Sequence, residues 1–279
     1  MVVQNRRPAR TGAAAVAAVG IMACAAGCGG GAEAGDLHAD ATHVVRQAAD
    51  RLVREGSSEA STSMEMASGG TRVTIRGEGV YDYRAGLGKL TVRLPQDAAG
   101  AQEHRPITEL LAPGALFMKN RGAGVPADKW VRVDTAALSD GNLVTGGATD
   151  PLAAAELLRG AREVTYAGES DIAGVRTRHY RGTVDLASAA EAASEGNKGA
   201  LAAAAKGFGG SAVPFDVYLD EEGLIRKVRH RFSFADTQNR KDVDVASTTL
   251  LYGFGKSASV RLPHKKDIYA GKVAEKDGP

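Results

Sequence analysis

One cysteine, Cys28, stands where its thiol could be chemically modified. It follows three small residues, 25–27, at the end of an apolar run that covers residues 12–26, and three arginines lie within the first ten residues. A positive start, an apolar stretch and a small-residue cleavage site are typical of a secretory signal peptide. The apolar run is shorter than the ~20 residues that a membrane-spanning helix needs. We therefore expect residues 1–27 to be a signal peptide.

The sequence Ala25-Ala26-Gly27-Cys28 resembles a bacterial lipobox, with Ala25 in place of the usual Leu. The resemblance implies that Cys28 becomes the first mature residue and carries a diacylglyceryl thioether, to which an N-linked chain such as palmitate can be added. Two acyl chains anchor a protein stably to a bilayer. The mature protein would then be held on the extracytoplasmic face of the cell membrane. The alternative is ordinary signal cleavage nearby, which would leave Cys28 unmodified.

No other residues have the spacing of a catalytic or metal-binding motif. The six histidines show no His-x-His or His-x₃-His spacing, and none has a neighbouring cysteine. There is no convincing Gly-x-Ser-x-Gly, Ser-x-x-Lys or phosphate-loop pattern. The second cysteine, Cys24, lies in the signal peptide, so the mature chain has no thiol pair for a disulfide. We expect no metal, no cofactor and no enzymatic activity.

Charge argues against a nucleic-acid partner. The chain has 35 Lys and Arg against 33 Asp and Glu; residues 1–27 hold three of the arginines and no acid, which leaves 32 against 33. A near-neutral domain gives no electrostatic reason to bind nucleic acid. Residues 28–39 form a Gly-rich spacer, and about ten such residues keep a domain within ~20 Å of its anchor.

The elements that follow change from helical to alternating periodicity. Residues 40–55 place apolar side chains on one stripe and predict an amphipathic helix. Further helices are expected over 150–159 and 187–206, the last with a break at Gly196–Gly199. The remaining segments alternate with period two and predict strands. The expected strands cover 59–67, 71–84, 89–94, 107–111, 116–119, 129–134, 163–169, 175–186, 213–220, 224–234, 242–254 and 259–262.

Consecutive strands joined by turns favour antiparallel pairing, and regular βαβ alternation is missing. We therefore expect an α+β fold over residues 40–262, with one large curved antiparallel sheet of about 11 strands and helices on its concave face. Residues 263–279 are expected to form a polar C-terminal tail.

Five segments resemble the LppX/LprG group of actinobacterial lipoproteins, which is related in shape to the LolA/LolB carriers. This resemblance implies a half-barrel whose apolar cavity holds the acyl chains of lipids or glycolipids. The segments are Lys129–Asp134, Asp150–Leu152, Val164–Glu169, Ile172–Tyr180 and Pro214–Lys227.

Ten apolar residues at alternate strand positions are the candidate lining of that cavity. Methionines on two of the strands suit an adaptable apolar surface. The alternative is that these residues form a conventional dry core, because patterned apolar faces are usually packed. The candidates are Met64, Met66, Leu90, Val92, Leu94, Leu116, Met118, Val228, Phe232 and Phe234.

Three functions are compatible with these features of the sequence. The first is a membrane-anchored lipoprotein that binds lipid or glycolipid acyl chains, for carriage or presentation in the cell envelope. The second is an envelope sensor that contacts a membrane protein without transport, like the anti-sigma co-regulators of the RseB type. The third is a hydrolase with dispersed catalytic residues, which has no support from any motif.

Overall fold

The computed structural model describes most of residues 40–270. Cys28, the expected signal peptide and the spacer lie outside the described part, as do the last nine residues of the expected tail. The described ranges are 40–95, 105–122, 124–145, 149–210, 212–236 and 241–270.

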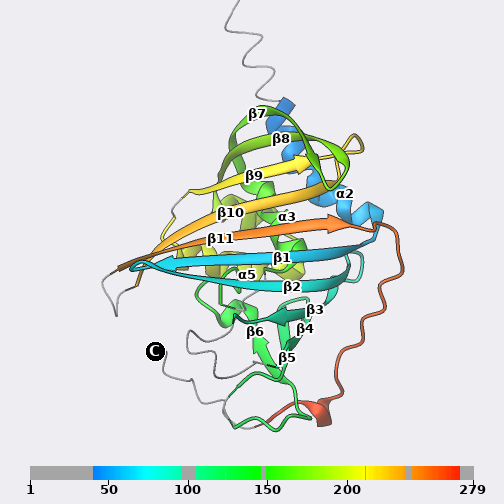
Figure 1. The fold of residues 1–279 in the computed structure, drawn as a ribbon, viewed down its shortest axis with the longest axis vertical. Coiled ribbons are helices and arrows are strands. Elements are labelled where there is room, and N and C mark those ends of the chain that lie inside the picture. Colours follow the sequence, from blue (N-terminus) through cyan, green and yellow to red (C-terminus); the bar gives the residue numbers. More distant parts are fainter. Residues whose placement is uncertain are drawn as a thin grey trace, which may run out of the picture.

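Within the described ranges, eleven strands form one open antiparallel sheet (Figure 1), which confirms the predicted half-barrel α+β fold. The sheet order is β6-β5-β4-β3-β2-β1-β11-β10-β9-β8-β7. The strands are β1 (Ser57–Ser68), β2 (Thr71–Asp82), β3 (Leu87–Arg93), β4 (Ile107–Ala112), β5 (Ala115–Lys119), β6 (Val131–Asp134), β7 (Ala161–Ile172), β8 (Val175–Val184), β9 (Val213–Leu219), β10 (Ile225–Asp236) and β11 (Lys241–Tyr252).

Two meanders make up this sheet, and they meet at its centre. Strands β1 to β6 follow one another from the centre to one edge of the sheet, and β7 to β11 follow one another from the other edge back to the centre. The first and last strands, β1 and β11, pair along nine residues, with Met64 opposite Ser247. The first and last strands therefore join the two halves of the sheet, although most of the other strand pairs are local.

The helices gather on one face of the sheet, behind the strands in the view of Figure 1. Residues 40–46 are helical and are followed by α2 (Ala48–Glu55), and the others are α3 (Pro151–Leu157), α4 (Leu186–Ala192) and α5 (Glu195–Gly207). Asp150 caps α3, because its carboxylate accepts hydrogen bonds from the amides of Leu152 and Ala153 at 2.7 and 3.1 Å.

The predicted break at Gly196–Gly199 is wrong. Both glycines lie inside α5, and the interruption between α4 and α5 comes earlier, at residues 193–194. Close packing explains the glycines: a Cβ at Gly196 would lie 2.9 Å from the Cβ of Pro113, and one at Gly199 would lie 3.2 Å from the Cβ of Ala136. The glycines allow α5 to approach its neighbours, and glycine inside a helix is tolerated at a modest cost.

The C-terminal segment also differs from expectation. Residues 259–262 form no strand, and the chain instead runs to the far edge of the sheet beside β6 (Figure 1). There the amide of Trp130 donates to the carbonyl of Asp267 at 2.8 Å, and the amide of Tyr269 donates to the carbonyl of Trp130 at 2.8 Å. Ile268 and Val260 pack on a small apolar cluster of the outer face. Part of the expected tail thus covers an exposed sheet edge.

Candidate functional site

The predicted cavity-lining residues lie together between the sheet and the helices. Nine of them belong to one apolar cluster that also holds Leu52 of α2, Leu157 of α3 and Leu201 of α5. The side chain of Phe234 lies outside the described part. Seven are buried (Met64, Leu90, Val92, Leu116, Met118, Val228 and Phe232), and Met66 and Leu94 are partly buried.

A pocket of about 690 Å³ opens where β9 and β10 separate. Pairing between these strands ends at His230 opposite Phe215, so the last residues of β10 have no β9 partner. Pro214, which has no amide hydrogen to donate to a ladder, stands at the start of β9 beside the opening. Of the predicted cavity set, Phe232 lines this pocket. We call it the β9–β10 pocket.

The floor of the β9–β10 pocket is apolar and is continuous with the core. It consists of Phe208, Val213, Phe232 and Val245, all of which belong to the main apolar cluster. The rings of Phe208 and Phe232 stack with centroids 5.0 Å apart. Phe208 comes from the segment that follows α5, so the floor joins the end of this helix to the ends of three strands.

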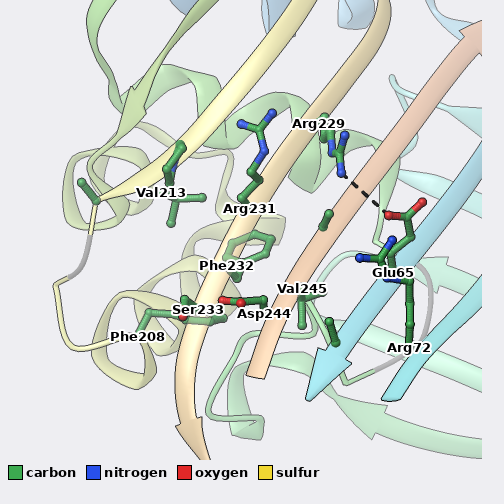
Figure 2. A pocket seen from close by; sticks show the side chains of 14 residues that line it. Glu65, Arg72, Phe208, Val213, Arg229, Arg231, Phe232, Ser233, Asp244 and Val245 are labelled. Atoms are coloured by element: carbon green, nitrogen blue, oxygen red, sulfur yellow. Dashed lines mark ion pairs between the residues drawn. The ribbon is translucent and has the colours of Figure 1, made fainter. Parts of the chain in front are cut away.

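The rim of the pocket is charged (Figure 2). Arg229 and Arg231 alternate with Phe232 along β10, so the arginines lie on the outer face and the phenylalanine faces the helices. Arg229 lies 3.8 Å from Glu65 of β1, and Arg231 lies 2.6 Å from Asp216 of β9. The remaining charged side chains of the lining are those of Arg72 and Asp244.

The arrangement of this pocket is amphipathic. Arginine side chains present planar hydrogen-bond donors that match carboxylate and phosphate groups. The apolar floor behind them can bury hydrocarbon. A molecule with an acidic or strongly polar end and an aliphatic or aromatic body matches both features, whereas a fully polar ligand matches only the rim.

One buried carboxyl was not anticipated. Glu109 of β4 is fully buried, and neither carboxyl oxygen has a hydrogen-bond partner among the described residues. It lies opposite Leu90 on β3 and Met118 on β5, both members of the predicted cavity set. Burial raises the pKa of Glu109 to about 8, and the charge of Arg121 offsets only part of this effect. The strict alternation of β4, with Ile107 and Leu111 on the same face, is the sequence signal that could have identified it.

A smaller pocket of about 350 Å³ lies at the opposite end of β2. Its lining includes Tyr83, Glu156 and Ser194. The carboxylate of Glu156 accepts hydrogen bonds from the amide and hydroxyl of Ser194, both at 3.1 Å, and from the Asn197 side chain at 2.9 Å. These bonds fix the first turn of α5. The acidic group here has a structural role in docking the helix.

Asp150 contacts Tyr81, which lines this smaller pocket, and like Glu109 it is a buried carboxyl with a raised pKa. Burial raises its pKa to about 6, although the two amides that it caps stabilise its charged form. The hydroxyl of Tyr81 donates to its carboxylate at 3.1 Å. The side chain therefore joins β2 to the start of α3.

Within the described residues, no helix combines the length and the apolar character that crossing a bilayer requires. The same residues contain no group of three or more His, Cys, Asp or Glu side chains placed to hold a metal ion.

The comparisons with known proteins find similarity only among solved structures. No protein-family model and no curated protein sequence matches this chain. Among solved structures, the lipoprotein LppX of Mycobacterium tuberculosis matches with 13% identity and a TM-score of 0.46, over 80% of this chain and 99% of that chain. A LolA superfamily protein of Nitrosomonas europaea matches with 9% identity and a TM-score of 0.32, over 82% and 97%.

A third match is the MucA/MucB complex of Pseudomonas aeruginosa, with 14% identity and a TM-score of 0.33, over 84% of this chain and 63% of that one. An LppX lipoprotein and a LolA superfamily protein, the two groups that the sequence resembles, are thus among the solved structures to which this chain is similar. Similarity at these identities and TM-scores says nothing about a ligand.

Proposed function

We propose that this protein is a membrane-anchored lipoprotein that binds lipid or glycolipid acyl chains, for their carriage or presentation in the cell envelope. The observation that carries the proposal is the β9–β10 pocket, whose apolar floor continues into the core and whose rim holds three arginines. No enzymatic step is part of this function.

The dimensions and lining of the pocket support an amphipathic ligand. Its volume of about 690 Å³ lies within the range of ~300–1,000 Å³ that is usual for small-molecule sites. An acyl chain would lie on Phe208, Phe232 and Val245, and the polar end would remain near Arg229 and Arg231. Burial of each CH₂ group contributes ~0.8 kcal/mol, so even a short buried segment gives useful affinity.

The predicted cavity set extends this site inward. Met64 and Met66 lie on β1 beside β11, and Val228 lies on β10 four residues from Phe232. Their side chains face the helices together with the pocket floor. We propose that a longer chain advances along this apolar surface as the helices and the unbranched methionine side chains adjust.

The anchor belongs to the same proposal. Lipidated Cys28 would hold the domain on the outer face of the cell membrane, and the spacer would keep it within ~20 Å of the lipid surface. A Cys28→Ala variant should be exported but recovered in the soluble fraction. Cofractionation of this variant with membranes, at the wild-type level, would show that the lipobox interpretation is wrong.

An experiment on the pocket tests ligand binding. Ala212 lines the pocket and is exposed, so an Ala212→Trp substitution places an indole in the opening without disturbing the core. A fluorescent acyl probe should bind the wild-type protein, and binding should weaken at least about tenfold in the variant. Ala187→Trp, on the exposed side of α4, is the matched control and should bind like the wild type.

Equal uptake by Ala212→Trp and the wild type would exclude this pocket as the entry site. Absence of uptake by the wild type would contradict lipid binding altogether. In that case, stoichiometric capture of a membrane-spanning regulator by the lipid-free protein would favour the sensor function.

A further inference from the structure

A polar patch interrupts the apolar inner face of the sheet behind the pocket floor. Its members are Thr62 of β1, His230 of β10, Ser247 and Thr249 of β11, and Thr149 from the segment before α3. All five are at most 4% exposed, although they carry hydroxyl or imidazole groups. We call this group the interior polar patch.

The strand register places the patch next to the β9–β10 pocket. Phe232 and Val245 of the floor lie opposite each other on β10 and β11, and the next inward-facing pair is His230 with Ser247. Thr249 belongs to the next inward-facing row beyond His230 and Ser247. Successive rows on one face of a strand lie ~7 Å apart, so a chain that passes the floor reaches the patch within one or two rows.

Two polar atoms of the patch lack a hydrogen-bond partner among the described residues. The hydroxyls of Thr149 and Ser247 are 2.6 Å apart, and the Thr149 hydroxyl donates to the carbonyl of Leu143 at 3.1 Å. In contrast, Nε2 of His230 and Oγ1 of Thr249 have no hydrogen-bond partner in the part of the chain that the structure describes. Buried polar atoms are nearly always paired, so these two atoms indicate a group that binds between them.

The chemistry of the two atoms restricts that group. Burial lowers the pKa of His230 to about 3, so its imidazole is neutral at physiological pH. A charged ligand group would lose its hydration without gaining an ion pair. Neutral imidazole nitrogen and threonine hydroxyl can each donate or accept according to tautomer and rotation. A hydroxyl can donate to one and accept from the other, whereas a carbonyl can only accept.

We infer that the interior polar patch binds a hydroxyl group carried on the acyl chain of the ligand, through His230 and Thr249. The protein would thus select hydroxylated acyl chains over plain ones. The inference rests on the proposed function, because the chain reaches the patch through the β9–β10 pocket. A water molecule held between the two atoms is the competing occupant.

The test compares octadecanoic acid with a positional series of its monohydroxylated forms, in competition with a fluorescent acyl probe. The wild-type protein should bind at least one hydroxylated isomer several-fold to about tenfold more tightly than octadecanoic acid. The double variant His230→Leu/Thr249→Val should lose this preference and keep its affinity for octadecanoic acid. Replacing unpartnered buried polar groups by apolar ones of similar size should leave the fold intact.

Two further variants complete the comparison. Thr177→Val removes a buried hydroxyl of β8 that donates to the carbonyl of Ser170 at 2.8 Å, outside the patch, and should keep the preference. His230→Gln retains hydrogen-bonding atoms and should keep part of it. The inference would be overturned if octadecanoic acid and all its hydroxylated forms bound with equal affinity. It would also be overturned if the double variant kept the preference for a hydroxylated form. Either result would leave the proposed function standing. Failure of every fatty acid to displace the probe, or of the probe to bind, would overturn both.

Discussion

Glu109 should make the stability of this protein fall with pH across a range in which few carboxyl groups titrate. Burial raises its pKa from an ordinary glutamate value of 4.5 to about 8 in the folded state. Between these two values the unfolded chain releases the proton and the folded chain keeps it. The folded state is therefore favoured by this group below pH 4.5 and loses that advantage as the pH rises towards 8.

The size of the effect follows from the difference in pKa. Each pH unit in this window changes the free energy of unfolding by ~1.4 kcal/mol, so Glu109 should lower stability by about 3 kcal/mol between pH 5 and pH 7. A Glu109→Gln variant retains the shape of the side chain and cannot ionise. Its free energy of unfolding should lack this slope.

Urea unfolding of both proteins at several pH values between 5 and 8 provides the measurement, with free energies from linear extrapolation. The quantity of interest is the difference between wild type and variant as a function of pH, because other groups titrate equally in both. Glu191→Gln, at an exposed position on α4, is the matched control and should follow the wild type. If Glu109→Gln and the wild type change in parallel, the burial assigned to this carboxyl is wrong.

Two other predictions concern the elements that frame the site. A Glu156→Ala substitution should destabilise the fold by about 2–3 kcal/mol and speed amide exchange in the first turn of α5, because three partly buried hydrogen bonds are lost. The control is Glu195→Ala, whose side chain is 93% exposed and which should change stability by less than about 0.5 kcal/mol. Equal effects of the two substitutions would refute the docking role of Glu156. Ending the chain after Leu262 should red-shift the fluorescence of Trp130, the single tryptophan, because the C-terminal segment that packs against it is removed. A chain that ends after residue 270 is the control. An unchanged spectrum in the shorter chain would contradict the edge contact.

Periodicity was sufficient to predict the architecture. The long alternating segments around Met64, Val228 and Thr248 each became a strand within a few residues of the expected bounds. The consecutive order of these segments, joined by turns, also indicated that neighbouring strands pair antiparallel. The pairing of β1 with β11 could not be predicted from the sequence, because no local signal shows which distant strands meet at the centre of a sheet.

The candidate site was predicted only in part. Alternation identified a shared apolar face, and Phe232 indeed lines the β9–β10 pocket. The position of the pocket depends on where pairing with β9 stops, which is a tertiary property that strand propensity does not encode. Two buried polar residues, Glu109 and His230, follow the alternation of their strands, but neither belongs to a catalytic or metal-binding motif, so the sequence assigned them no role.

The most direct test of lipid binding is native mass spectrometry of the Cys28→Ala variant, which lacks the anchor, purified without detergent from the soluble fraction of bacteria that export it. Lipid binding predicts a population whose mass exceeds that of the polypeptide by one amphiphile, which organic solvent releases and which is strongly reduced in the Ala212→Trp variant. A mass that equals the polypeptide alone, in protein that also fails to take up acyl chains from added vesicles, would contradict it.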